Sequence, residues 1–81
     1  MTRNELHAAV LQELKRIAPE LEESALEPAK PLRDQVDLDS MDWLNFLVAL
    51  HERLKVEIPE SDYARLGTLE QTVDYLAKKL G

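Results

Sequence analysis

Residues 36–44 have the sequence Val36-Asp37-Leu38-Asp39-Ser40-Met41-Asp42-Trp43-Leu44, an acidic segment that runs into an apolar one with a single hydroxyl at the junction. Apolar residues then recur at positions 44, 47, 48, 50 and 54, close to the spacing that marks one buried helical face. The pattern predicts a helix over residues 40–54 that begins at Ser40. Unpaired N–H groups and the helix dipole favour negative charge at this end, so a phosphate attached to the hydroxyl would be stabilised there.

The same residues support a simpler interpretation. Asp39 is a residue type that caps helix N-termini, and Asp42, three residues later, completes a weakened capping box with Asp in place of Glu or Gln. Starts of this kind open a large share of helices. The local pattern therefore predicts a helix start but names no function.

The predicted helix is more apolar than a surface helix needs to be. Its apolar residues cover well over half of its circumference, so we expect contacts on several sides, as for the central helix of a bundle. These residues are Met41, Trp43, Leu44, Phe46, Leu47, Val48, Ala49, Leu50 and Leu54. His51 lies near the Leu44-Leu47-Leu54 face, so we expect it at the edge of the core. A role as a base is not expected, because no ionisable group is placed to form a catalytic pair with it.

Toward the N-terminus, Thr2-Arg3-Asn4-Glu5 is a capping box that predicts a helix from Arg3 to Ile17, ended by Pro19. Its apolar stripe consists of Leu6, Val10, Leu11, Leu14 and Ile17. The connection from Pro19 to Asp39 is long and holds three prolines, with leucines at 21, 26, 32 and 38. We expect a functional loop pinned to the core by these leucines, with at most a short helical turn within residues 20–26.

Toward the C-terminus, residues 55–59 are expected to form an extended connection with Val56 and Ile58 turned inward. Residues 60–66 predict a short third helix ended by Gly67 at the C′ position. Thr68-Leu69-Glu70-Gln71 is a second capping box, which opens a last helix with the stripe Leu69, Val73, Leu76 and Leu80. The predicted fold is all-α, a four-helix bundle with a long first loop and a short third helix, in a single domain over residues 1–81.

Composition narrows the classes of function. A chain of 81 residues is too short to build a deep enzyme cleft, and without cysteine it has no disulfide or thiolate metal site. His7 and His51 have no second ligand at metal-binding spacing, so we expect no metal site. Neither a signal-peptide core nor an apolar run long enough to span a bilayer occurs in the sequence, which favours the cytoplasm.

The net charge of −6 is concentrated in one part of the chain. Residues 34–62 hold eight acids and two bases, whereas the rest of the chain holds eight of each. This distribution argues against nucleic acid or anionic lipid as a partner and favours a basic protein surface. Solubility alone is the alternative explanation, but it would not require the acids to be so concentrated.

A resemblance to a known family covers roughly residues 3–80. The segment Asp39-Ser40-Met41-Asp42, the apolar helix after it, the element Val56-Glu57-Ile58-Pro59-Glu60 and the final amphipathic helix together resemble an acyl carrier protein. The Asp-Ser-Leu core of the family is matched at two of three positions, with Met41 in place of Leu. The spacing from Ser40 to Pro59 matches without a gap.

The resemblance implies a freestanding carrier rather than an enzyme. Ser40 would accept 4'-phosphopantetheine from coenzyme A, and the thiol of that group would hold an acyl intermediate as a thioester. Asp39 matches the acidic residue that supports this transfer in the family. The implied partners of such a monomer are a phosphopantetheinyl transferase and acyl-loading and acyl-transferring enzymes with basic surfaces. The expected partner-binding residues are Met41, Asp42, Trp43, Asn45, Val48 and Glu52.

The chain departs from the family pattern at several positions. Val36 and Asp37 stand where Leu-Gly is common, and Asn45, His51 and Arg53 occupy places that are often acidic in fatty-acid carriers. These departures favour a specialised acyl, polyketide, aminoacyl or lipid pathway over ordinary fatty-acid synthesis. A small acidic helical protein-interaction module without a prosthetic group is the alternative.

Trp43 is the only tryptophan and lies three residues after Ser40. Its ring could lie along Leu47 and Leu50 and widen the core, or it could stay exposed as an aromatic anchor for a partner enzyme. We expect a position at the boundary of the core, with a part in both roles.

Overall fold

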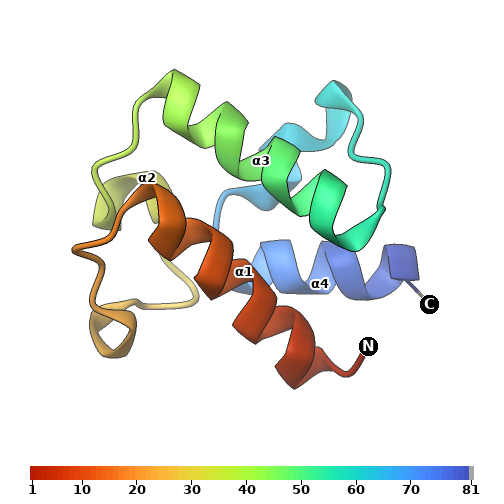
Figure 1. The fold of residues 1–81 in the computed structure, drawn as a ribbon, viewed down its shortest axis with the longest axis horizontal. Helices are drawn as coiled ribbons and strands as arrows, with labels where there is room; N and C mark the ends of the chain where they lie inside the picture. Colours follow the sequence, from red (N-terminus) through yellow and green to blue (C-terminus); the bar gives the residue numbers. More distant parts are fainter. Residues whose placement is uncertain (81) are drawn as a thin grey trace.

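The computed structural model describes residues 1–80 and confirms the all-α bundle with a long first loop (Figure 1). Three longer helices form its frame: α1 (Arg3–Ile17), α3 (Ser40–Leu54) and α4 (Leu69–Leu80). The short third helix of the prediction is the 3-10 helix η2 (Glu60–Leu66). The first loop contains the expected helical turn, η1 (Glu23–Ala25), and a four-residue helix that the sequence did not indicate, α2 (Leu32–Gln35).

Reciprocal caps fix the starts of α1 and α4 where the sequence predicts them. The Glu5 N–H donates to Thr2 Oγ1 over 3.1 Å, and the Thr2 N–H donates back to Glu5 Oε1 over 2.9 Å. Hydrogen bonding of the Glu5 carboxylate to the Thr2 N–H, and then to the Thr2 side chain, lowers the pKa of Glu5. Thr68 and Gln71 exchange the same pair of bonds, of 3.0 and 3.2 Å, at the start of α4. Each box satisfies two N–H groups that the helix itself leaves unpaired.

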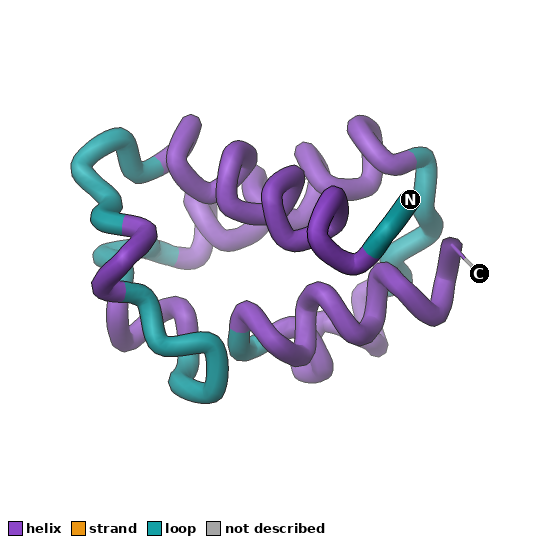
Figure 2. The backbone as a smooth tube through the Cα atoms, turned by 90° about the horizontal axis from the view of Figure 1, so that it is seen from below, coloured by secondary structure: helices purple, strands orange, loops and turns teal. Residues whose placement is uncertain are grey.

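The core lies where α1 meets α3 and α4 (Figure 2). Its fully buried side chains include Leu6, Val10 and Leu14 of α1, Phe46, Leu47 and Leu50 of α3, and Val73 and Leu76 of α4. Two ends of the predicted stripes lie outside it: Ile17 is half-buried and Leu80 is 39% exposed. Both lie in the last turn of a helix, where the neighbouring elements no longer cover the side chain.

The first loop is pinned to the core, as expected. Leu32, Val36 and Leu38 are buried, and Leu21 and Leu26 are half-buried against the core. Backbone hydrogen bonds also join this loop to the segment before α4: the Leu32 N–H donates to the Gly67 carbonyl over 2.8 Å, and the Glu70 N–H donates to the Pro28 carbonyl over 3.1 Å. The loop is therefore an ordered part of the fold.

The short third helix ends directly before Gly67, as predicted, but Gly67 does not adopt the left-handed conformation that is common after a helix. Gly67 has φ −69° and ψ −31°, because η2 continues directly into the turn that caps α4 and the Gly67 carbonyl is held by Leu32. The left-handed residue is Lys55 at the end of α3, with φ 54°. The N–H groups of Lys55 and Val56 both donate to the His51 carbonyl, which holds this turn.

His51 and the segment after it lie as the sequence predicts, at the edge of the core. The His51 side chain is exposed, and its Nδ1 lies 2.7 Å from the Val56 carbonyl oxygen. Val56 is buried and Ile58 is half-buried, so the extended connection turns its apolar residues inward.

A partly buried hydrogen bond joins η2 to α4. The Tyr75 hydroxyl donates to Asp62 Oδ2 over 2.6 Å. Burial, and then this hydrogen bond, raise the pKa of Tyr75 to about 12, so the hydroxyl keeps its proton at neutral pH.

The two ends of the described chain lie together, at the side of the bundle away from the start of α3 (Figures 1 and 2). An ion pair between Arg3 and Asp74 joins the first turn of α1 to α4 near this side.

Candidate functional site

Ser40 is the first residue of α3, and its side chain is exposed. The residue before it, Asp39, is extended and caps the helix, since the Asp42 N–H donates to Asp39 Oδ1 over 2.8 Å. Within residues 1–80 no bond returns from the Asp39 N–H to the Asp42 side chain, so only half of the predicted capping box forms. The shorter Asp side chain at this position explains the difference, because a capping box uses Glu or Gln there.

The Ser40 hydroxyl is free to react. In the described part of the chain it takes part in no hydrogen bond, and no ionisable side chain is bonded to it. The hydroxyl therefore has no built-in base, which suits an acceptor whose activation comes from another protein. A covalent group at this position projects into solvent, and a phosphate there faces the N-terminus of a 15-residue helix. The residues present thus fit a phosphate-linked group on Ser40. The described residues contain no group of three or more metal-ligating side chains.

Asp39→Ala is expected to lower the free energy of unfolding by about 0.5–2 kcal/mol, because the Asp42 N–H loses its acceptor. Urea unfolding followed by circular dichroism measures this change. Asp37→Ala is the matched control, since Asp37 is an exposed acid of the same loop that caps no helix. Equal losses in the two variants would show that the cap contributes nothing.

The expected partner-binding residues all lie on α3, with side chains that are exposed or half-buried. Met41 is 66% exposed, Val48 is 41% exposed, Asn45 and Glu52 are exposed, and Asp42 and Trp43 are half-buried. The structure thus places all six residues within reach of solvent on the helix that begins at Ser40.

Leu44 and Val48 do not belong to the buried face, contrary to the prediction. Both are 41% exposed, and with Met41 they form an apolar strip, here called the α3 strip. At about 100° per residue the three side chains fall within about 60° of one another on the helix. Phe46, fully buried, fills the core instead. An exposed apolar strip of this kind is a candidate interaction surface.

Trp43 lies at the boundary of the core, as expected, but against a different neighbour. Its ring packs on Phe46, with the centroids 5.4 Å apart and the planes tilted by 39°. The side chain is half-buried. One part of the indole therefore supports the core, and the rest is open to a partner.

A partly open cavity of about 290 Å³ lies between α3, the segment after it and η2. It is lined by Leu47, Val48, Ile58 and Tyr63, together with His51 and Glu57. The sequence did not reveal this cavity, because it depends on how the segment after α3 returns across the helix. It lies next to the α3 strip, of which Val48 is a member.

Arg53 is engaged with α1. Its Nη2 donates to Gln12 Oε1 over 2.7 Å, and its Nη1 lies 3.6 Å from Glu13 Oε1. Glu13 is only 4% exposed and also pairs with Arg16 at 3.3 Å. The burial of Glu13 could not be predicted from the sequence, since its cations, Arg16 and Arg53, come from two helices. Arg53 therefore balances a buried acid, and Asp42 and Glu52 remain as acids on the outer part of α3.

The part of the chain that the structure describes contains no helix that is both long and apolar enough to cross a bilayer.

Comparisons with known proteins add the following findings. The family model described as "Phosphopantetheine attachment site" matches residues 5–76. The acyl carrier protein of Chlorobium phaeovibrioides is 32% identical over 54 residues, which cover 67% of this chain and 69% of that protein. The acyl carrier protein of Rubrobacter xylanophilus is 28% identical over 72 residues, which cover 85% and 89%.

A solved structure of the acyl carrier protein from Enterococcus faecalis has a similar fold. Its TM-score is 0.76, and the match covers 98% of this chain and 99% of that one at 23% sequence identity. At this level of identity the likeness concerns the fold.

Proposed function

Because the chain belongs to the acyl carrier protein family, whose members are non-catalytic carriers with a covalently attached 4'-phosphopantetheine group, we propose that Ser40 is its attachment residue. When attached, that group supplies the thiol that holds an acyl intermediate as a thioester. The observation that supports the proposal best is the exposed Ser40 hydroxyl, free of hydrogen bonds in the described chain, at the capped start of α3.

The roles of the protein's own residues follow from this geometry. In this transfer the Ser40 oxygen would bond to phosphorus while the pyrophosphate bond of coenzyme A breaks and its adenosine bisphosphate part leaves. The serine proton would pass to a base that the modifying enzyme supplies. Asp39 holds the first turn of α3 through the Asp42 N–H, and so fixes the position of Ser40. Its second carboxylate oxygen takes no hydrogen bond within residues 1–80 and is the atom proposed to help hold a metal ion during transfer.

The chain is proposed to serve a specialised acyl, polyketide, aminoacyl or lipid pathway. Support comes from three residues that reduce the acidity of α3: Asn45, His51 and Arg53. Arg53 also contacts Gln12 and Glu13 of α1. The alternative of an interaction module without a prosthetic group is not favoured, since the family match extends over residues 5–76. Intact mass before and after incubation with coenzyme A and a broad-specificity phosphopantetheinyl transferase tests the choice.

Family membership implies a phosphopantetheinyl transferase and acyl-handling enzymes as partners. We place their contact on the α3 strip and on its neighbours Asp42, Trp43, Asn45 and Glu52, with a basic surface on the partner. Acids on the outward face of α3 attract such a surface, and the apolar strip and the open part of Trp43 supply area to bury.

Asp42→Asn and Glu52→Gln are each expected to slow modification by roughly 1.5- to 5-fold, the effect of losing an exposed ion pair worth about 0.2–1 kcal/mol. Raising the salt concentration should slow the wild type as well, because it screens all the exposed charges. The measurement is the initial rate of mass gain at low concentration of the carrier. Glu70→Gln on α4 is the matched control, an exposed acid on another helix. Modification at a rate indifferent to salt would contradict the proposed contact.

A further inference from the structure

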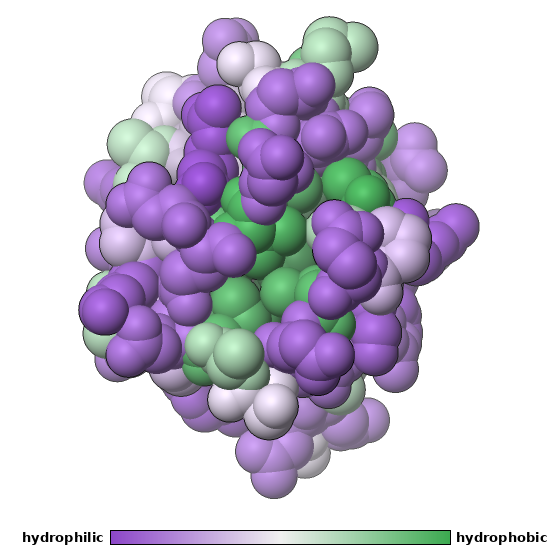
Figure 3. Space-filling view, turned by 90° about the vertical axis from the view of Figure 1, so that its left-hand side faces the viewer, coloured by the Kyte–Doolittle hydropathy of each residue, from purple (hydrophilic) through white to green (hydrophobic). Residues whose placement is uncertain are grey.

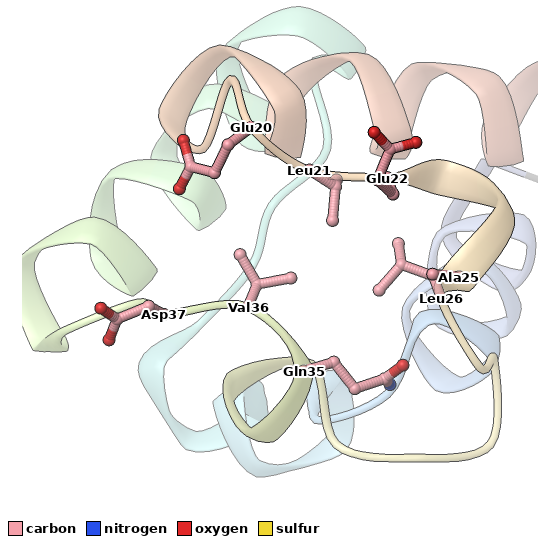
Figure 4. Close-up of a pocket in the computed structure, with 8 residues that line it drawn as sticks. All are labelled: Glu20, Leu21, Glu22, Ala25, Leu26, Gln35, Val36 and Asp37. Carbon is pink, nitrogen blue, oxygen red and sulfur yellow. The ribbon is translucent and has the colours of Figure 1, made fainter.

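A hollow of about 280 Å³ lies between two segments of the first loop, residues 20–26 and 35–37. Figure 3 views the molecule from the side of this loop and shows apolar surface at the bottom of a depression ringed by hydrophilic side chains. In the close-up of Figure 4, Leu21, Leu26 and Val36 point into the space between the segments, and the carboxylates of Glu20, Glu22 and Asp37 lie at its periphery. These six residues define the loop pocket.

Hydrogen bonds hold the walls of the loop pocket in place. The Gln35 amide accepts from the Glu27 N–H over 2.7 Å and donates to the carbonyls of Glu27 and Lys30, both over 2.9 Å. The Val36 N–H donates to the Leu32 carbonyl over 2.8 Å, and Val36 itself is only 6% exposed. The pocket is therefore formed before any ligand arrives, which lowers the cost of binding.

The loop pocket has one sign of charge. Its lining holds three carboxylates and neither a lysine nor an arginine, while its floor is made of aliphatic side chains. An aliphatic stem that ends in a cation matches both parts, since arginine and lysine bury their stems on apolar surface and keep the charged head at the edge. Arginine fits better than lysine, because its guanidinium is more weakly hydrated and donates to two carboxylates at once.

The loop pocket lies close to Ser40 along the chain. Asp37 precedes Ser40 by three residues, which span at most about 11 Å when fully extended. A standard protein interface covers about 800 Å² on each partner, equivalent to a disc with a radius of about 16 Å. An enzyme that centres its contact on Ser40 therefore reaches Asp37, at the edge of the loop pocket.

We infer that the loop pocket receives an arginine or lysine side chain of the phosphopantetheinyl transferase that modifies Ser40. The pocket gives the carrier a second docking point, on the first loop, besides the surface of α3. The identity of the partner rests on the proposed function, whereas the preference of the pocket for an alkyl cation does not.

The first test is a titration of the unmodified, isotope-labelled chain with n-butylguanidinium, followed by NMR. We expect saturable shifts at the backbone amides of Leu21, Leu26 and Val36. The neutral probe n-butylurea should bind at least fivefold more weakly. Equal binding of the two probes would overturn the inference, and so would cation-induced shifts at the cavity between α3 and η2 instead. Shifts of the loop amides with protein concentration alone would also overturn it, because a second copy of the chain would then fill the pocket.

A matched pair of double variants provides the second test. Glu20→Gln with Glu22→Gln removes two charges from the rim, and Glu60→Gln with Glu70→Gln removes two exposed acids elsewhere. The rim variant should bind n-butylguanidinium at least threefold more weakly and should be modified at least threefold more slowly by the transferase. The control variant should stay within twofold of wild type in both measurements. Identical modification rates in the two variants would refute docking at the pocket. A wild type that never gains mass would refute the proposed function instead, since the titration needs no modification.

Discussion

Ser40→Ala is expected to abolish the gain of the 4'-phosphopantetheine mass completely when the chain is incubated with coenzyme A and a broad-specificity phosphopantetheinyl transferase. The substitution removes the oxygen that must bond to phosphorus, and no other hydroxyl within residues 1–80 combines exposure with the start of a long helix preceded by an acidic cap. Intact-mass spectrometry measures the result directly. Ser40 is exposed, so the variant should unfold at nearly the same denaturant concentration as the wild type.

Ser24 and Ser61 are the internal controls for this result. Both are exposed, and both lie in 3-10 helices, η1 and η2. Ser24→Ala and Ser61→Ala should therefore gain the mass as the wild type does. A Ser40→Ala variant that is still modified would show that another residue carries the group.

Phe46→Ala is expected to lower the free energy of unfolding by about 3–5 kcal/mol, because the ring is fully buried between α3 and the rest of the core. A domain of this size has only about 5–15 kcal/mol in all, so the variant should be largely unfolded at modest urea concentrations. Urea titration followed by circular dichroism measures the loss. Met41→Ala is the control on the same helix and should change stability little, since Met41 is 66% exposed.

Trp43→Ala should fall between these two variants and should also slow loading by the partner enzymes. The indole packs on Phe46, but it is only half-buried. A loss of stability as large as that of Phe46→Ala would place the whole ring in the core. A variant as stable as the wild type and loaded at the same rate would show that Trp43 neither supports the core nor contacts a partner enzyme.

The helix boundaries could be predicted because their determinants are local. Thr2 with Glu5, Asp39 with Asp42, and Thr68 with Gln71 each act over three residues, so the sequence shows the whole interaction. The position of Ser40 at the start of a helix could be predicted for the same reason, whereas its proposed role came from the resemblance to the family. Whether its hydroxyl is engaged by a neighbour required the structure.

The buried face of α3 could not be predicted in full. Apolar residues surround this helix, so periodicity alone does not separate Phe46 from Leu44 and Val48. The packing of α1 against one side of the helix makes this choice. The helix α2 and the loop pocket depend on contacts between distant residues, such as Leu32 with Gly67 and Gln35 with Glu27, which no local pattern records.

The position of the two chain ends has a practical consequence for orienting the protein. Both ends lie on the side of the bundle away from the start of α3 (Figure 1). A tag, a solid support or a fused domain attached at either end would therefore hold the protein on the side opposite the start of α3. The end that holds Ser40 would point away from the tether, and an enzyme arriving from solution would meet the same unobstructed surface whichever end was used.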